Sequence, residues 1–280
     1  MYINPAWRIL TIGDGDLSFS RSLLENYRPQ SLVATIFDDI STLNTKYGVT
    51  HFQQLQAHGC EVLTGFDVTN NQTWGALAKH QFDAVIFQFP LLPAFDSVED
   101  YNQQCLNISL NTLHRRLLRR YLFNCFDCFL DSTGAQLAFI TSKDVKPYRQ
   151  WHIEQSLTIN SDIHYLGCMA FEIEKFPGYK IRNVDRDKHV KDTQGLTYVF
   201  SRKINTELNN KLSKPDYLSN NRLNDNGLDD NHLADNYCSY CRVGPFYTEQ
   251  DKQSHFDSKK HQKMAQYEQQ WLNDIELFKK

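Results

Sequence analysis

Short apolar segments alternate with helix-compatible segments along the first 205 residues of the chain. The run FDAVIFQFP at 82–90 is apolar on both faces, which is typical of a central strand in a parallel sheet. The same reading predicts strands at 9–12, 31–38, 60–63, 82–90, 135–141, 167–174 and 196–202. Helices are expected at 18–27, 40–58, 98–130 and 153–159. This alternation predicts an α/β fold with a doubly wound parallel sheet.

The composition changes sharply after this region. Residues 206–236 are rich in Asn, Asp, Lys, Leu and Ser and show no sustained periodicity, so we expect a flexible linker there. A compact basic and aromatic unit follows at 237–264, and the tail at 265–280 has apolar residues at helical spacing. We therefore expect one large domain at 1–205, a linker, a small C-terminal domain and a terminal helix.

Charge and cysteine usage narrow the class of protein. The net charge is −3, so contacts with nucleic acid must come from local basic patches. No apolar run reaches the roughly 18–20 residues that span a bilayer, and the start MYINPAWR does not predict a signal peptide. Seven scattered cysteines do not suggest a disulfide framework, and Cys125 and Cys128 are expected to be buried apolar residues of a helix. We expect a cytoplasmic protein without a membrane partner.

A glycine turn between the first strand and the first helix is the first candidate site. Gly13 and Gly15 allow a tight turn and a close approach of a ligand to the backbone. Asp14 and Asp16 would repel a pyrophosphate but not a cationic cofactor such as S-adenosylmethionine. Such turns also occur in flavin and nicotinamide enzymes and in ordinary α/β connections, and these alternatives stay open on the turn alone.

The C-terminal unit carries a metal-binding pattern. Cys238-x2-Cys241 and His255-x5-His261 offer two thiolates and two imidazoles at a spacing that closes a tetrahedral zinc site. The segment resembles the U1-type, or matrin-type, subclass of ββα Cys2His2 fingers in its histidine gap and its HFDSKKH run. That resemblance implies RNA binding, with Lys259 and Lys260 as phosphate contacts, while a protein-contact role is the alternative.

A second basic cluster lies in the long predicted helix. Four arginines follow one another in the run HRRLLRR, at Arg115, Arg116, Arg119 and Arg120. A solvated helix face is the default interpretation of such a run. In a chain of net negative charge, the cluster is also a candidate contact for RNA phosphates.

Seven sequence blocks over residues 8–203 together resemble one family, the Rossmann-like rRNA (uridine-N3) methyltransferases. The blocks are ILTIGDGDLSFSRSL, LVATIFD, GFDVT, FDAVIFQFP, TSKDVKPYRQWHIE, FPGYKIRN and TYVFSRK. The resemblance implies S-adenosylmethionine as the cofactor and transfer of a methyl group to RNA, at N3 of a uridine in rRNA. It also implies a nucleolar location if the source is a eukaryote. The oligomeric state is not predicted.

The resemblance assigns roles to individual positions. Gly13, Asp14, Gly15 and Asp16 would form the cofactor loop, and Asp67 would bind the adenine amino group. An acid that ends the second strand binds the ribose hydroxyls in such folds, and Asp38 fits that place, with Asp39 as its competitor.

The methyl donor would meet the substrate base at the end of the fourth strand. That end reads Gln88-Phe89-Pro90 here, followed by Leu91-Leu92-Pro93, where family members carry Asn-Phe-Pro followed by His and Gly. Lys143 and Asp144 are candidates for handling the N3 proton, and Tyr148 and Trp151 for stacking on a flipped base or packing the sheet edge. Because the fourth-strand block is altered, a non-catalytic RNA-binding or assembly factor is the alternative function.

Overall fold

Seven strands form one sheet in the order β3-β2-β1-β4-β5-β7-β6. Strands β1 to β5 pair in parallel, and β7 runs antiparallel to both β5 and β6. The predicted doubly wound α/β sheet is confirmed, but the expected parallel order does not extend to β7. Apolar runs do not encode strand direction, and an antiparallel neighbour needs no crossover helix. The strands are β1 (Arg8–Ile12), β2 (Ser31–Thr35), β3 (Glu61–Leu63), β4 (Ala84–Gln88), β5 (Leu137–Lys143), β6 (His164–Phe171) and β7 (Gly195–Ser201).

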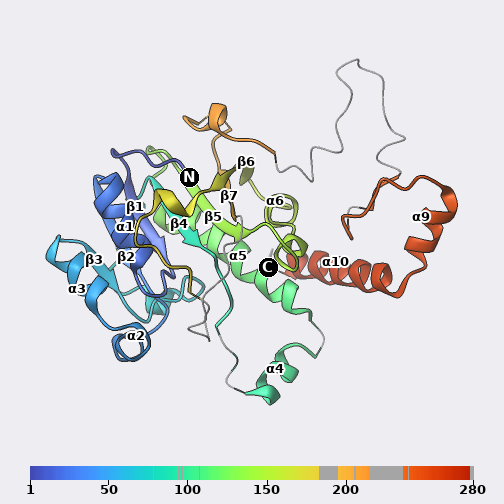
Figure 1. Ribbon diagram of the computed structural model, residues 1–280, viewed down its shortest axis with the longest axis horizontal. Coiled ribbons are helices and arrows are strands. Elements are labelled where there is room, and N and C mark those ends of the chain that lie inside the picture. The colour runs from blue at the N-terminus through green and yellow to red at the C-terminus, as the bar shows by residue number, and fades with distance from the viewer. Residues whose placement is uncertain are drawn as a thin grey trace. The chain divides into compact units, whose positions relative to one another are not determined.

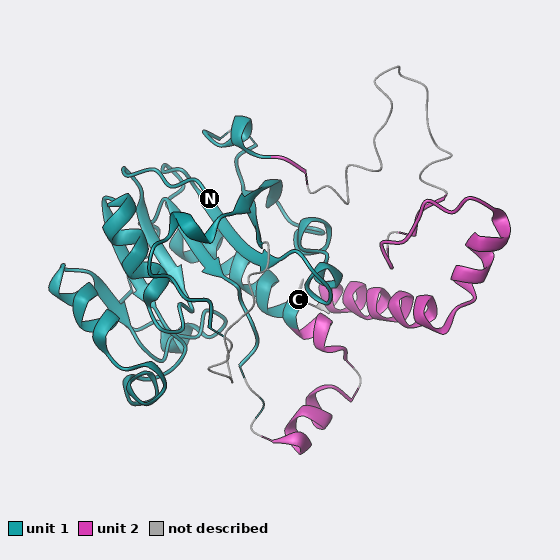
Figure 2. Ribbon diagram, viewed as in Figure 1, with its two compact units in different colours: residues 1–96, 114–212 teal, residues 97–113, 213–280 magenta. Residues whose placement is uncertain are grey.

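Figure 1 shows the computed structural model, and Figure 2 divides it into two compact units, 1–96 with 114–212 and 97–113 with 213–280. The sheet and the glycine turn belong to the first unit, and the Cys/His pattern belongs to the second. The structure describes residues 1–77, 79–93, 95, 97–106, 108–182, 195–204, 206–214, 236–238 and 240–277.

The helices between the strands largely follow the prediction, with two differences in detail. The polar stretch at 40–58 forms two helices, because Gly48 ends the first one in a positive-φ conformation. The segment predicted as one helix at 98–130 is divided into two helices and a π-helical turn at Cys125–Phe129. The helices are α1 (Ser18–Tyr27), α2 (Ile40–Tyr47), α3 (Thr50–Ala57), α4 (Val98–Gln104), α5 (Leu110–Asn124) and α6 (Ile153–Ser156).

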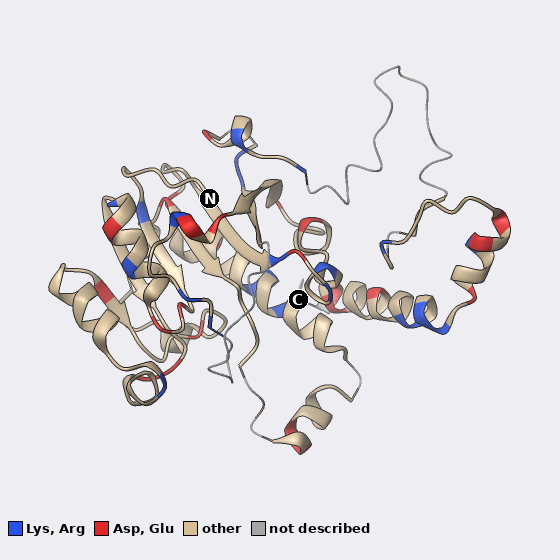
Figure 3. Ribbon diagram, viewed as in Figure 1, with Lys and Arg blue, Asp and Glu red and all other residues tan. Residues whose placement is uncertain are grey.

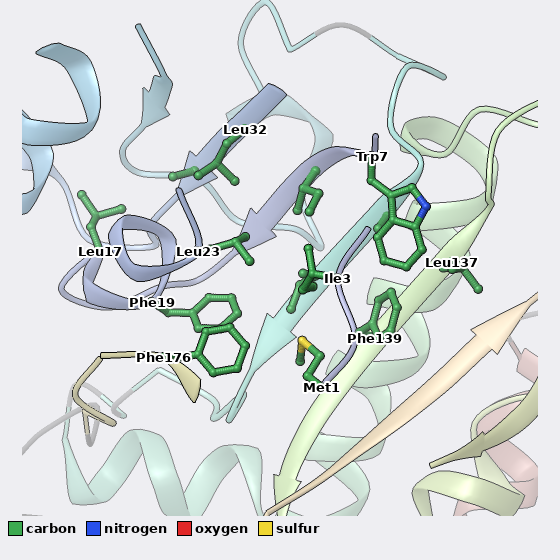
Figure 4. Packing of buried hydrophobic residues seen from close by; sticks show 14 of the residues in the cluster. Met1, Ile3, Trp7, Leu17, Phe19, Leu23, Leu32, Leu137, Phe139 and Phe176 are labelled. Carbon is green, nitrogen blue, oxygen red and sulfur yellow. The ribbon is translucent and has the colours of Figure 1, made fainter. Parts of the chain in front are cut away.

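The core of the first unit joins both ends of its sequence (Figure 4). The ring of Phe19 in α1 lies 5.1 Å from that of Phe176, and the ring of Trp7 lies 6.0 Å from that of Phe139 in β5. Cys125 is fully buried in this unit, as predicted, whereas Cys128 is only partly buried. Burial of these large side chains supplies the main favourable free energy of the fold.

The first unit extends to Leu212, beyond the predicted boundary at 205. Trp7 donates a hydrogen bond from Nε1 to Glu207 over 2.8 Å, and Leu208 is completely buried. The first residues of the predicted linker at 206–236 thus pack against the sheet domain, because one apolar side chain anchors an otherwise polar segment. The remainder of that prediction, at 215–235, lies outside the described residues.

The second unit contains the C-terminal helices α9 (Glu249–Phe256) and α10 (Lys259–Leu277). The Thr248 hydroxyl accepts a hydrogen bond from the Asp251 amide and begins α9. An antiparallel bridge joins Cys238 to Val243 ahead of these helices. The predicted division between a small domain at 237–264 and a terminal helix at 265–280 falls inside α10, which continues through it without a break.

Candidate cofactor and metal sites

The glycine turn follows β1 at the carboxyl edge of the sheet. Gly13 has a φ of 62°, and a Cβ at this position would lie 2.8 Å from Cε2 of Phe87 in β4. The Asp14 amide donates to the Thr35 carbonyl over 3.0 Å, which ties the turn to β2. Glycine is required at residue 13 both for its backbone angle and for the space beside β4.

Both acids of the turn are buried and point back into the start of α1. The Ser20 amide donates to Oδ2 of Asp14 over 2.6 Å, and the Ser18 amide donates to Oδ1 of Asp16 over 3.0 Å. Burial, with a smaller contribution from the Asp16 charge, raises the pKa of Asp14 to about 7. The first amides of α1, which bind pyrophosphate in dinucleotide sites, are therefore occupied by carboxylates of the protein itself.

The other three predicted acids follow the neighbouring strands β2 and β3. Asp39 accepts a hydrogen bond from the Thr42 amide over 2.7 Å and caps α2. Asp38 pairs with Lys46 over 3.0 Å, and its carbonyl accepts a hydrogen bond from the Gly65 amide. Oδ1 of Asp67 accepts hydrogen bonds from both the amide and the hydroxyl of Thr69. Because Asp39 is a helix cap, Asp38 is the better candidate for a ribose contact.

A pocket lies at the carboxyl ends of β4 and β5, with about 260 Å³ of space that includes the solvent at its mouth. Phe89 directly follows β4 with a φ of 46°, a left-handed conformation that is uncommon for an aromatic residue. Gln88 is buried, and its Oε1 has no hydrogen-bond partner among the described residues. The pocket is lined by Phe89, Pro90, Leu91, Ser142, Lys143, Tyr148, Ile181 and Arg182.

The candidate residues at and after the end of β5 lie in different environments. Lys143 lines the pocket, where burial lowers its pKa, and its Nζ lies 5.6 Å from the centre of the Tyr148 ring. Asp144 forms an ion pair with Arg149 over 2.6 Å, and it is not among the residues that line the pocket. Trp151 is almost fully buried and stacks on His114 at 4.4 Å, so it packs the domain rather than offering a face to a base.

Arg182 is a site residue that the sequence analysis missed. Its Nε lies 2.7 Å from Oδ2 of Asp16, and its guanidinium carbon lies 4.9 Å from the centre of the Tyr47 ring. Arg182 belongs to the FPGYKIRN block, to which the sequence analysis assigned no role, and this block brings the arginine over the glycine turn. The sequence signal that could have identified this arginine is its place near the end of that block.

The arginines of α5 do not share one face. Arg115 is buried and donates to the Gln150 carbonyl over 2.8 Å, and Arg119 is buried and donates to the Leu157 carbonyl over 2.6 Å. Arg116 is partly exposed and Arg120 is exposed. The expectation that Arg115 and Arg119 contact phosphates is corrected, because their guanidinium groups are used inside the domain, while Arg116 and Arg120 stay candidates.

Four predicted metal ligands converge in the second unit. The ligand atoms of Cys238, Cys241, His255 and His261 all lie within 4.8 Å of one another. Nδ1 of His261 lies 3.4 Å from Sγ of Cys238 and 3.7 Å from Sγ of Cys241. Ligand bonds of about 2.0–2.3 Å in a tetrahedral zinc site place such atoms about 3.3–3.8 Å apart.

The imidazole of His255 also fits a metal ligand. Its Nε2 is buried and has no hydrogen-bond partner within the part of the chain that the structure describes. Burial lowers its pKa, which favours the neutral imidazole that binds metal ions. The cluster can therefore hold a metal ion. Lys259 and Lys260 are exposed at the start of α10, where Figure 3 shows basic residues.

The strand order, the antiparallel β7 and the glycine turn closed to pyrophosphate define a Rossmann-like methyltransferase domain. The family model described as rRNA (uridine-N3-)-methyltransferase, BMT5-like, matches residues 10–183. The chain belongs to this family. None of the described helices has the length and apolarity needed to cross a membrane.

Two curated relatives also match the chain. Heavy metal-associated isoprenylated plant protein 41 of Arabidopsis thaliana is 28% identical over 64% of this chain and 33% of its own length. The ferredoxin-fold anticodon-binding domain-containing protein 1 homolog of Mus musculus is 26% identical over 70% of this chain and 31% of its own length. The chain thus spans about a third of the length of the curated relatives it matches.

Two solved structures also match parts of the chain. An antibiotic related methyltransferase is 10% identical with a TM-score of 0.42, and the match covers 70% of this chain and 88% of that chain. TrmN from Thermus thermophilus is 9% identical with a TM-score of 0.40, and the match covers 71% of this chain and 44% of that chain.

Proposed function

We propose that this protein transfers a methyl group from S-adenosylmethionine to N3 of a uridine in rRNA. Membership of the family supports methyl transfer to RNA. The observation that carries the proposal in this chain is the pocket at the carboxyl ends of β4 and β5, because a lysine and the aromatic residues Phe89 and Tyr148 line it. Cofactor and acceptor base would then meet at the carboxyl ends of β1, β4 and β5.

The glycine turn and the neighbouring strand ends would hold the cofactor. Asp38 would bind the ribose hydroxyls and Asp67 the adenine amino group, while Gly13 and Gly15 allow close approach to the backbone. Asp14 and Asp16 contribute by filling the helix amides, which disfavours a cofactor with a pyrophosphate group. When bound, the cofactor supplies a methyl group on a sulfonium.

The pocket residues would position the base and stabilise its charge. Uridine N3 carries a proton, so negative charge develops on the uracil ring as the proton leaves. Lys143 would stabilise that charge, and its lowered pKa also allows it to accept the proton. Phe89 and Tyr148 offer ring faces or edges to a flipped base. Asp144 would position the loop after β5 through Arg149, and Gln88 and Pro90 would shape the end of β4.

The second unit would hold Zn²⁺ and tether RNA. Cys238, Cys241, His255 and His261 would bind the ion, which supplies folding free energy to a segment with little core of its own. Two pairs of basic side chains would contact phosphates and raise the local concentration of RNA at the pocket. These are Arg116, Arg120, Lys259 and Lys260. We place the protein in the cytoplasm, or in the nucleolus of a eukaryotic cell.

Incubation of purified protein with unmodified rRNA and S-adenosylmethionine tests the proposal. We expect mass spectrometry of the digested RNA to show 3-methyluridine with the wild type, and a rate lower by about 100-fold or more with Lys143→Met. The exposed Lys79→Met is the matched control and should retain the wild-type rate. Absence of any methylated nucleoside, with rRNA binding retained, would instead favour the non-catalytic assembly factor.

A further inference from the structure

Arg182 and Asp16 form an ion pair directly over the glycine turn. Nε of Arg182 lies 2.7 Å from Oδ2 of Asp16, and the Asp16 side chain is only 2% exposed. A Cβ built on Gly15 would lie 3.6 Å from Cβ of Arg182, so the arginine covers the turn at its second glycine. The pair therefore places a partly exposed positive group and a buried negative group beside the turn.

The segment that carries Arg182 is anchored to the first turn of α1. The Lys180 amide donates to Oγ of Ser18 over 3.0 Å, and the Tyr179 ring lies 5.3 Å from the ring of Phe19. The Tyr47 ring supports the guanidinium from α2 at 4.9 Å. Contacts from two helices thus hold the arginine in place, which lowers the entropic cost of binding a ligand.

The charges of this pair match those of a free α-amino acid group. We propose that Arg182 binds the carboxylate of the methionine part of S-adenosylmethionine, with Asp16 facing its ammonium group; the inference rests on the cofactor of the proposed function. A guanidinium binds a carboxylate through two parallel hydrogen bonds, a geometry that an ammonium side chain does not provide. Arg182 also lines the pocket with Lys143, so the bound amino acid group lies beside the site for the acceptor base.

An RNA phosphate is a poorer ligand for this arginine. Asp14 and Asp16 are both buried within the turn, and a phosphate would add negative charge beside them without bringing a cation of its own. A methionine group is a zwitterion and brings its own ammonium to Asp16. The arginine is also only about a quarter exposed, with 26% of its side-chain surface accessible, which suits a small ligand better than a polymer backbone.

Calorimetry with two adenosine ligands tests the assignment. S-adenosylhomocysteine carries the amino acid group, and 5′-methylthioadenosine lacks it. We expect Arg182→Gln to weaken S-adenosylhomocysteine binding by at least about tenfold and to leave methylthioadenosine binding within about twofold of the wild type. Arg182→Lys should fall between wild type and Arg182→Gln. Arg21→Gln, which removes an arginine of α1 paired with Glu25, is the control and should bind both ligands as the wild type does.

Four other outcomes would overturn the assignment. Equal weakening of both ligands by Arg182→Gln would show a structural role for the arginine, and an unchanged affinity for both would show no contact. Weaker binding of rRNA with unchanged S-adenosylhomocysteine binding would show a phosphate contact. If the wild type itself binds neither ligand, the proposed function fails, and this inference fails with it.

Discussion

Oδ2 of Asp14 lies 2.6 Å from the backbone nitrogen of Ser20, at the first turn of α1. In a dinucleotide-binding domain this helix end faces a pyrophosphate, whereas here a side chain of the protein occupies it. This contact distinguishes the turn from glycine turns of similar sequence that bind a pyrophosphate. It also means that the ionisation state of Asp14 affects the stability of the fold.

Asp14 should make the stability depend on pH between its unfolded and folded pKa values. The folded pKa, about 7, is raised above the ordinary value of 3.8. Its contribution to stability is therefore fully present below pH 3.8 and is lost as the pH rises toward 7. We expect the free energy of unfolding of Asp14→Asn to rise relative to that of the wild type by up to about 1.4 kcal/mol for each pH unit within this window.

Chemical denaturation of both proteins at several pH values measures this difference. The partly exposed Asp100→Asn is a control whose difference from the wild type should not change in the same way. A constant difference between Asp14→Asn and the wild type from pH 4 to pH 7 would mean that Asp14 stays ionised throughout this range.

Gly13→Ala should be more destabilising than Gly65→Ala. Both glycines have similar positive φ values, 62° and 67°, so each alanine pays a cost of about 1 kcal/mol for its backbone conformation. Only at Gly13 would the added Cβ also lie 2.8 Å from the Phe87 ring, while nothing lies within 4 Å at Gly65. The difference between the melting temperatures of the two variants measures the steric part of the destabilisation. Equal melting temperatures would contradict the close approach of residue 13 to the Phe87 ring.

Substitutions in α5 should separate folding from RNA binding. Arg115→Gln and Arg119→Gln are expected to lower the free energy of unfolding by about 1–3 kcal/mol, because each leaves a carbonyl without its donor. Arg116→Gln and Arg120→Gln should keep the stability within about 0.5 kcal/mol and reduce the salt dependence of RNA binding. Denaturation and filter binding at several salt concentrations measure the two effects, and the opposite pattern would refute the division.

Zinc should bind in a ratio of one ion per chain and be needed only by the second unit. Cys241→Ser should abolish stoichiometric zinc in elemental analysis, whereas Cys60→Ser, a cysteine outside the cluster, should retain it. A chelator should make α9 and α10 sensitive to protease and leave S-adenosylhomocysteine binding unchanged. Retention of zinc by Cys241→Ser would argue against the four-ligand site.

Local sequence was sufficient to predict two parts of this protein. The apolar run before Gly13 and the acid-glycine alternation after it predict a strand, a tight turn and a helix, because each depends on neighbouring residues. The spacing of Cys238, Cys241, His255 and His261 likewise predicts a common ligand set, and their side chains do converge. Both predictions concern groups that lie near one another in the sequence or belong to a single motif.

Only the tertiary structure decided where the polar side chains of these motifs point. Asp14 turns into α1, Arg115 turns into the domain, and Arg182 reaches Asp16 from 166 residues away. The apolar pattern of β7 also did not indicate the direction of this strand. Sequence alone therefore determined which chemical groups occur together locally, while the packing of distant segments determined which of them are buried as structural contacts and which face a ligand, because burial and long-range pairing depend on the whole fold.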